Sequence, residues 1–435
     1  MYDLVIKNGH CLIDGRWSSD FIYVNDERIA LISPSDFPAR QTFDAGGHKI
    51  LPGLIDPHVH FDLDLGSIKS RDDFEYGSKA GVYGGMTCYV DFLAPTRNGK
   101  QLEQAFNDRL EQAKKSHIDY HFHATICQPD GDLEQYVLTM KRLGMHTLKL
   151  FTTYSDSNRN TSDEHIIELL KLSKVHDILI MAHIEDDAQI SLKDEYGYID
   201  LPISRPTRAE TDEALKLAGY VKKYGGKLYM VHLSSGRTLE ALKNYYPELI
   251  NHCLFIESCP QYFLLDQSLL HKDDGYIYTC APPLRTMEEI KLLHKHKLSI
   301  DTIGTDHCAF NLADKLTPRL KGMPLGIGGI EYSFALMYPI FGDDLIARMS
   351  ERPAQLMGLP RKGKIAVGYD ADFAIFIDSK DGRVTTSHGA VDHSVYQGMH
   401  VAGYFDTLIN RGHFIMNRGA FIGGRGQFLK GKPIK

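Results

Sequence analysis

The sequence predicts an α/β fold in which a (β/α)8 barrel interrupts a small β-sandwich built from both chain ends. Between residues 51 and 361, short apolar stretches alternate with helical patterns, as the strands and helices of a parallel barrel do. Before and after that region, strand patterns are punctuated by turn residues. We therefore expect the sandwich to comprise residues 1–50 and 362–435, the latter including a tail, and the barrel to comprise residues 51–361.

Composition places the chain among ordinary globular proteins. Of its 435 residues, 43% are hydrophobic and 24% charged, and the formal net charge is −7. A mild negative charge without a long basic stretch gives no support for binding nucleic acid or an anionic membrane. There is no run of about eighteen apolar residues that would predict a transmembrane helix, and the N-terminus does not resemble a signal peptide. Seven scattered cysteines without a C-x-x-C motif favour a reducing, cytoplasmic setting.

The chain ends are predicted to be β-structure. Residues 2–9 alternate in hydrophobicity and stop at Asn-Gly, and residues 21–24 and 29–32 flank a polar turn, which predicts a β-meander. Residues 364–376 predict two strands across a Gly-Tyr-Asp turn, and residues 407–412 repeat the pattern of the first strand. We therefore expect the two ends to share one sandwich.

The barrel prediction depends on counting strands. Its first strand leads to His58, and helical patterns at 100–115, 163–176 and 207–223 separate later strands. Together they give the eight β units of a (β/α)8 barrel, whose chemistry sits at the C-terminal ends of the strands. The remaining strand candidates are residues 86–92, 120–127, 147–151, 178–182, 228–231, 254–257 and 300–305.

A histidine pair follows the first barrel strand. In LPGLIDPHVHFD, residues 51–62, His58 and His60 are two positions apart, so a strand would present both side chains on one face. Neutral imidazoles are favoured ligands of zinc and similar ions. The pair by itself is weak evidence, and it becomes half of a predicted metal site only with residues from later strands.

Four polar residues stand at the ends of later strands: Lys149, His183, His232 and Asp306 at strands four, five, six and eight. Each has a structural explanation, as a snorkelling lysine, a hydrogen-bonded interior histidine or a turn carboxylate. Their recurrence at strand ends, together with the histidine pair, favours a metal site. A buried Lys149 facing these histidines could take up carbon dioxide and become an anionic, bidentate carbamate.

Two other histidine pairs are predicted to be structural. His121 and His123 lie at the start of a strand, with residues 124–127 still to follow, so they face away from the catalytic end or pack inside. His294 and His296 lie on a predicted helix, where positions i and i+2 do not share a face.

Motifs along almost the whole chain resemble the amidohydrolase superfamily, in its dihydropyrimidinase/hydantoinase branch. They are PGLIDPHVHFD, LKLFTTYS, MAHIED, SRPTRAETDEA, VHLSSG, ESCPQYFLLD, APPLR, GTDHCAF, KGKIAVGYDADFAIF and GRGQFLKGKP. The resemblance implies two divalent cations, usually zinc, bridged by a hydroxide and by the carboxylated side chain of Lys149. The other implied ligands are His58, His60 and Asp306 for one cation and His183 and His232 for the second.

The same resemblance implies ring opening of a cyclic amide, a dihydropyrimidine or a 5-substituted hydantoin, by the bridging hydroxide. Asp306 would accept the proton of the hydroxide and pass it to the departing nitrogen. Tyr154 would donate its phenol to the developing oxyanion, although simple packing is the alternative for this residue.

Substrate contacts in the family are made largely by the main chain, at positions that match Ala281 and Leu325. Hydantoinases usually have Ser and Asn there, so this sequence departs from the pattern at both positions. Leu63, Leu65 and Phe151 are candidates for an apolar wall that faces a ring substituent. The resemblance also implies a homo-oligomer, a tetramer or dimer, with the tail at 423–435 as a possible partner-binding arm.

Alternatives remain at this point. Dihydroorotases typically carry an arginine shortly after H-x-H to grip a carboxylate, whereas this sequence continues with the acidic and apolar residues 61–66 and reaches Arg71 late. Allantoinase is harder to separate because its substrate is also a hydantoin ring. A non-catalytic scaffold, like the neuronal dihydropyrimidinase-related proteins, belongs to another class. Such proteins have lost metal ligands, and every ligand position is filled here.

Overall fold

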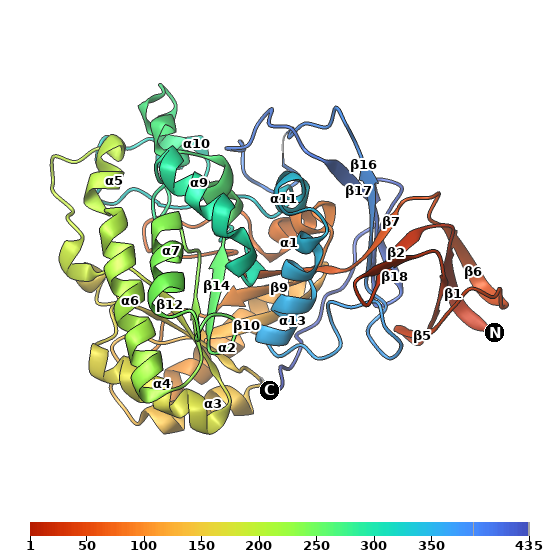
Figure 1. Cartoon of the computed structure of the whole chain (residues 1–435), viewed down its shortest axis with the longest axis horizontal. Helices are drawn as coiled ribbons and strands as arrows, with labels where there is room; N and C mark the ends of the chain where they lie inside the picture. Colours follow the sequence, from red (N-terminus) through yellow and green to blue (C-terminus); the bar gives the residue numbers. More distant parts are fainter. Residues whose placement is uncertain (386, 434–435) are drawn as a thin grey trace.

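The computed structural model describes residues 1–385 and 387–433. The barrel forms one side of the molecule and the sheets of the two chain ends form the other (Figure 1). The N-terminus lies at the outer edge of these sheets, whereas residues 431 and 432 of the tail lie against the barrel side of the molecule. Among the described residues, no helix is long and apolar enough to cross a membrane.

The eight barrel strands are parallel and lie side by side in chain order, which confirms the predicted (β/α)8 barrel. A bridge between Val59 and His307 brings the end of the last strand beside the first and closes the barrel. The strands are β8 (Leu54–Val59), β9 (Met86–Phe92), β10 (Asp119–Thr125), β11 (Thr147–Phe151), β12 (Leu179–His183), β13 (Leu228–Met230), β14 (Leu254–Ser258) and β15 (Thr302–Ile303).

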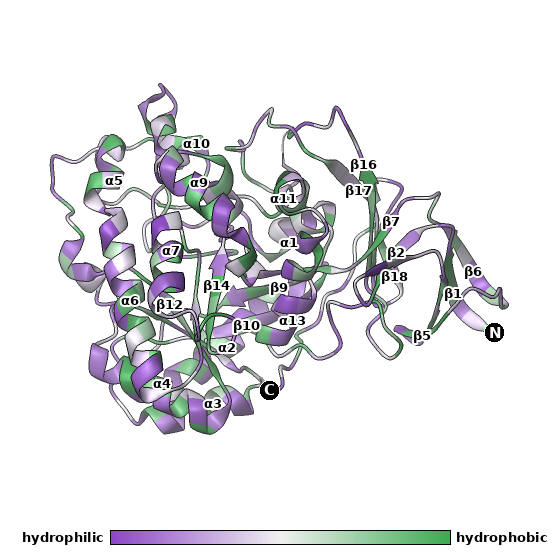
Figure 2. Cartoon of the chain, in the orientation of Figure 1, coloured by the Kyte–Doolittle hydropathy of each residue, from purple (hydrophilic) through white to green (hydrophobic). Residues whose placement is uncertain are grey.

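Helices surround the barrel, each with a hydrophobic side toward the strands. Polar and apolar residues alternate along helices such as α4 and α6 in Figure 2, the pattern of a helix half-buried on a sheet. Side chains of Asp73, Asn98, Asp132, Ser162 and Ser235 accept the free backbone N–H groups where helices begin.

The α-helices are α1 (Phe74–Tyr83), α2 (Gly99–Gln112), α3 (Leu133–Arg142), α4 (Asp163–His176), α5 (Leu201–Ser204), α6 (Thr207–Tyr224), α7 (Gly236–Tyr245), α8 (Pro260–Leu264), α9 (Met287–His296), α10 (Leu312–Lys315), α11 (Ser333–Phe341), α12 (Asp344–Arg348) and α13 (Glu351–Leu356). The shorter 3-10 helices are η1 (Ala113–Lys115), η2 (Ser155–Ser157), η3 (Asp187–Gln189), η4 (Tyr198–Asp200), η5 (Gln267–His271), η6 (Gly275–Tyr278) and η7 (Lys297–Ser299).

The chain ends form two sheets that enclose a separate hydrophobic core. Leu4 and Ile22 of the first sheet pack with Phe373, Ile375 and Ile409 of the second. The first sheet has the order β5 (Arg28–Ser33), β4 (Phe21–Asn25), β1 (Tyr2–Lys7) and β6 (Ala39–Asp44). The second has the order β19 (Ala420–Phe421), β18 (His413–Asn417), β17 (Gly403–Asn410), β16 (Phe373–Asp378), β7 (Lys49–Pro52), β2 (His10–Ile13) and β3 (Arg16–Ser18).

Antiparallel pairing of β7 with β16 unites the two chain ends in one sheet, as predicted. Two details of the sandwich prediction were wrong. The N-terminal strands are not a simple meander, because β1 also pairs in parallel with β6. The segment before β16 contains no strand at 364–366, because its turn bonds instead to the start of β5, with Gly368 N donating to Ile29 O and Ile29 N to Tyr369 O.

The described part of the tail lies along the barrel. Gly426 N donates to Ser116 O, Tyr120 N to Gln427 O, and Leu429 N to Tyr120 O. These partners flank the start of β10, so the tail covers the end of the barrel opposite to the C-terminal strand ends.

A buried charge cluster joins the barrel to the sandwich. Lys362 Nζ lies 2.7 Å from Asp119 Oδ2 at the start of β10, 2.7 Å from Asp372 Oδ2 beside β16, and 3.2 Å from Asp370 Oδ2. Burial opposes the charge of Lys362, but the three carboxylates outweigh it and raise the pKa of the lysine well above its ordinary value. Arg411 also pairs with Asp119 and Arg361 with Asp370, so Lys362 is the ion-pair partner on which Asp372 depends.

We expect Lys362→Met to lower the free energy of unfolding by about 3–5 kcal/mol, because it leaves the buried carboxylate of Asp372 without its cation. Asp119 keeps its pair with Arg411, and Asp370 keeps its pair with Arg361. Urea unfolding followed by circular dichroism measures the effect. Lys114→Met, which removes an exposed ion pair with Glu111, is the control and should leave the midpoint unchanged. A Lys362→Met midpoint equal to that of the control would contradict the expectation.

Candidate metal centre

His58, His60 and Asp306 converge at the catalytic end of the barrel. His58 Nε2 and His60 Nε2 are 3.2 Å apart, and each lies 3.1 Å from Asp306 Oδ1. A tetrahedral ion with ligands at about 2.05 Å places neighbouring ligand atoms about 3.3 Å apart. The three side chains thus already stand at the spacing that a zinc ion requires, and they form a group that could hold a metal.

His183 and His232 form a second pair beside the first. His183 Nδ1 lies 3.1 Å from His232 Nε2, again close to the ligand spacing of a tetrahedral ion. The ring of His232 is 5.4 Å from the ring of His58, so the two groups are neighbours. All of the histidines that the sequence predicts as ligands therefore meet in one place.

Lys149 reaches the same place from β11. Its side chain is 2% exposed, and its Nζ lies over the rings of Phe92 and Phe151, at 5.6 and 5.2 Å from their centroids. Within the described residues it forms no ion pair, and burial lowers its pKa to about 7 despite the pull of Asp306 and Glu257. This burial does not fit a snorkelling lysine, whose amine would reach solvent.

The buried carboxylate of Glu257 supports both groups, and sequence reasoning did not single it out. Glu257 Oε1 accepts from His58 Nδ1 at 2.7 Å and from the backbone N–H of His232 at 2.9 Å, while Oε2 accepts from Tyr229. A proton held on His58 Nδ1 leaves the Nε2 lone pair free toward a metal. The sequence signal that could have identified Glu257 was a single acidic residue within the apolar strand β14.

Asp56 similarly links the first and last strands of the barrel. Its Oδ1 accepts from the backbone N–H groups of His58 and Thr305, each at 3.1 Å, and its Oδ2 accepts from the Thr305 hydroxyl. One buried side chain thereby fixes the residue before Asp306 relative to His58. Burial raises the pKa of Asp56 to about 6.

Charge at Asp306 is stabilised by the histidines. Burial disfavours the carboxylate, but the charge and hydrogen bond of His58 and the hydrogen bond of His60 hold the pKa of Asp306 well below its ordinary value. Asp306 Oδ1 faces both histidines, while Oδ2 makes no hydrogen bond to any described residue. One carboxylate oxygen is therefore free to exchange a proton.

Tyr154 and Phe151 lie at the rim of the site. The ring of Tyr154 is 5.1 Å from that of His183 and 5.9 Å from that of Phe151. Burial raises the pKa of Tyr154 to about 12, so its phenol stays protonated at neutral pH. The backbone of Tyr154 is left-handed, with a φ of 73°, a conformation that only surrounding contacts maintain in a non-glycine residue.

The other predicted substrate contacts lie on loops at the same end of the barrel. Leu63 and Leu65 are half-buried on the loop after β8. Ala281 and Leu325 belong to the loops after β14 and β15, which are joined where Gly326 N donates to Thr279 O. The side chain of Leu325 packs against an apolar cluster that contains Leu201, Leu320 and Met323 rather than against the metal ligands.

The two other histidine pairs that the sequence analysis considered have structural partners. His123 lies between Thr147 Oγ1 and Pro57 O, and His121 Nδ1 lies 2.7 Å from Leu429 O of the tail. His294 bonds to Phe263 O and His296 to Glu240.

Fold and site together define a class: a (β/α)8 barrel whose strand ends present a cluster of histidine, aspartate and lysine side chains. The model of the Amidohydrolase family matches residues 50–315. The D-hydantoinase of Geobacillus stearothermophilus is 31% identical over 440 residues, covering 95% of this chain and 92% of the relative. The D-phenylhydantoinase of an Escherichia coli strain is 31% identical, with 95% and 94% covered.

Solved structures agree over the whole length. The dihydropyrimidinase from Brevibacillus agri superposes with a TM-score of 0.93 at 27% identity and covers 100% of both chains. The L-hydantoinase from Arthrobacter aurescens has a TM-score of 0.88 at 25% identity, with 99% and 100% covered. The chain belongs to the amidohydrolase family, and its relatives are the hydantoinases and dihydropyrimidinases that its motifs indicated.

Replacing one ligand tests the metal centre. We expect His183→Asn to weaken zinc binding by more than the roughly 10–100-fold that loss of an outer hydrogen-bond partner costs, because a donor atom itself is removed. Metal content after dialysis against a graded chelator series measures it. His294→Asn, at a histidine bonded only to Phe263 O, should retain the zinc of the unmodified protein. Equal zinc content in both variants would exclude His183 as a ligand.

Proposed function

We propose that the protein hydrolyses a cyclic amide, opening a dihydropyrimidine or 5-substituted hydantoin ring, with two divalent cations, which we propose to be zinc. The observation that carries the proposal is that the residues proposed as ligands lie together at one barrel end, beside the phenol of Tyr154. The proposed ligands are His58, His60 and Asp306 for one cation, His183 and His232 for the other, and Lys149 for both.

When bound, the cations would supply an activated water and polarise the carbonyl under attack. Asp306 would take the proton of that water on Oδ2, the oxygen without a partner among the described residues, and return it to the departing nitrogen. The low pKa of Asp306 keeps this carboxylate ionised at the start of the reaction.

Tyr154 would stabilise the negative charge that develops on the carbonyl oxygen. A donor of this kind must be protonated, and the raised pKa of the phenol meets that condition. The contact between its ring and that of His183, at 5.1 Å between centroids, supports this role over simple packing.

Lys149 would act as a carboxylated ligand shared by both cations. Its neutral amine would add to carbon dioxide, and the carbamate formed would present two oxygens to the surrounding ligands. Support comes from its burial and from the lack of an ion-pair partner within the described chain.

The substrate would be a neutral ring. Arg71, the first arginine after H-x-H, pairs with Asp314 at 3.0 Å and so does not present a free cation for a carboxylate. This favours hydantoins and dihydropyrimidines over dihydroorotate. Main-chain groups at Ala281 and Leu325 would bind the ring, with Leu63, Leu65 and Phe151 against its substituent.

The presence of every proposed ligand residue also favours catalysis over a scaffold role.

The seven cysteines are all free thiols, which supports the reducing, cytoplasmic setting expected from the sequence. A homo-oligomer, tetramer or dimer, stays part of the proposal and rests on the resemblance to the family.

Ring opening is the direct test. Protein purified with zinc and bicarbonate should open dihydrouracil or 5-substituted hydantoins, and the loss of ring absorbance measures this reaction. The Asp306→Asn variant should lose this activity because the proton carrier is gone. Allantoin and dihydroorotate belong in the same assay. Turnover of dihydroorotate alone, or activity retained by Asp306→Asn, would contradict the proposal.

Lysine carboxylation has its own test. Lys149→Ala should lose zinc and turnover together, and Lys149→Arg should lose both as well, because arginine keeps the charge but forms no carbamate. A short carboxylate such as acetate should partly restore zinc binding to Lys149→Ala by filling the vacated space. Either variant retaining both metals and full turnover would disprove the carbamate bridge.

A further inference from the structure

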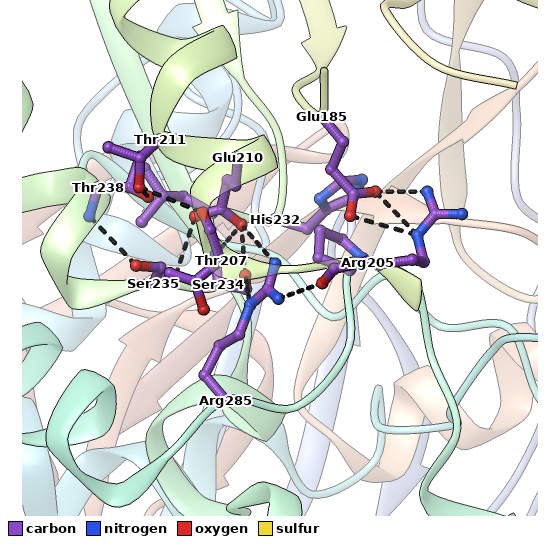
Figure 3. A network of polar contacts seen from close by, with 12 residues as sticks. Glu185, Arg205, Thr207, Glu210, Thr211, His232, Ser234, Ser235, Thr238 and Arg285 are labelled. Atoms are coloured by element: carbon purple, nitrogen blue, oxygen red, sulfur yellow. Dashed lines mark hydrogen bonds and ion pairs between the residues drawn. The ribbon is translucent and has the colours of Figure 1, made fainter. Parts of the chain in front are cut away.

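Arg205 is buried beside the candidate metal centre. It follows α5 directly and is 6% exposed. Its Nε lies 3.2 and 3.1 Å from the two carboxylate oxygens of Glu185, and its Nη2 also donates to Glu185 (Figure 3). A bidentate pair of this kind holds both groups in one orientation.

Glu185 extends this orientation to a proposed ligand. Its Oε2 lies 2.6 Å from His183 Nε2, so the ring proton belongs on Nε2 and is donated to the carboxylate. The lone pair of His183 then lies on Nδ1, the atom that faces His232 Nε2. Glu185 thereby selects both the tautomer and the direction of the ring.

The same guanidinium holds the proposed oxyanion donor. The Cζ atom of Arg205 lies 4.8 Å from the centroid of the Tyr154 ring, within cation–π range. Tyr154 has a left-handed backbone, which is unfavourable without external support. Arg205 is thus in contact with the phenol ring on one side and the carboxylate of Glu185 on the other.

A second arginine anchors this arrangement from behind. Arg285 Nη1 donates to the carbonyl oxygen of Arg205 at 2.7 Å, and its Nε donates to Ser234 Oγ at 2.9 Å (Figure 3). Glu210 accepts from the backbone N–H groups of Ser234 and Ser235, which follow His232 closely along the chain. The backbone of Arg205 is therefore tied to the segment that carries the other histidine.

We propose that Arg205 is a positioning residue that sets His183, through Glu185, and the Tyr154 ring in one arrangement. The inference rests on the proposed function for the role of Tyr154. The link from Arg205 to His183, the proposed metal ligand, concerns zinc binding alone. It can therefore be tested whether or not the protein turns over a substrate.

Two measurements test the proposal. Arg205→Gln should weaken binding of the second zinc equivalent roughly 10–100-fold in competition with a chromophoric chelator. At saturating zinc, it should lower kcat with little change in KM, because Tyr154 acts only on the developing charge. In a Tyr154→Phe background, the same substitution should have a much smaller effect on kcat.

Conservative variants separate orientation from charge. The Arg205→Lys variant should show most of the loss of zinc affinity and kcat expected for Arg205→Gln, since lysine lacks the planar guanidinium that binds Glu185 at two atoms. If Arg205→Gln does not fold, Glu185→Gln tests the same link and should show the zinc effect. Arg352→Gln is the matched control: it breaks a pair with Asp301 at the opposite end of the barrel and should leave zinc affinity unchanged.

Unchanged zinc affinity in Arg205→Gln or Glu185→Gln would overturn the link to His183. If Arg205→Gln lowers kcat equally with and without the Tyr154 hydroxyl, the link to the phenol is overturned. If Arg205→Lys has the zinc affinity and kcat of the unmodified protein, the orientation role is overturned. Should the unmodified protein open no ring, the proposed function fails, while zinc competition still decides whether Arg205 positions His183.

Discussion

A single buried carboxylate, Glu257, holds the two halves of the candidate metal centre together. It accepts from the ring of His58 on the first strand and from the backbone of His232 after β13, while Tyr229 binds its other oxygen. A buried charge is tolerated only when such partners surround it. Because these partners come from different strands, the closed barrel and the arrangement of ligands depend on each other.

The same constraint recurs around the site. Asp56 fixes the first and last strands to each other, and Glu185 is neutralised by Arg205. Burial opposes the charge of Glu185, but Arg205 and the hydrogen bond from His183 lower its pKa below the ordinary value. Each acid near a ligand thus serves both stability and orientation, which explains why the ligand nitrogens already stand at metal spacing.

Local pattern sufficed for much of the fold. Hydrophobic stretches predicted the residues of β9 and β11, and α4 occupies residues 163–176, where the helical pattern placed it. The prediction failed at 364–366, because the backbone of that turn bonds to residues near Ile29, far away in the chain. Long-range pairing of this kind leaves no periodicity in the local sequence.

Sequence by itself determined which residues are chemically able to form the centre. The histidines, Lys149 and Asp306 were recognisable because each stands at a strand end and parallel barrel strands end on one face. Only the tertiary structure decided which nitrogen of each histidine is free, through acids such as Glu257 and Glu185. The physical reason is that a ring's tautomer and direction depend on hydrogen-bond partners from other strands, and these meet only when the barrel closes.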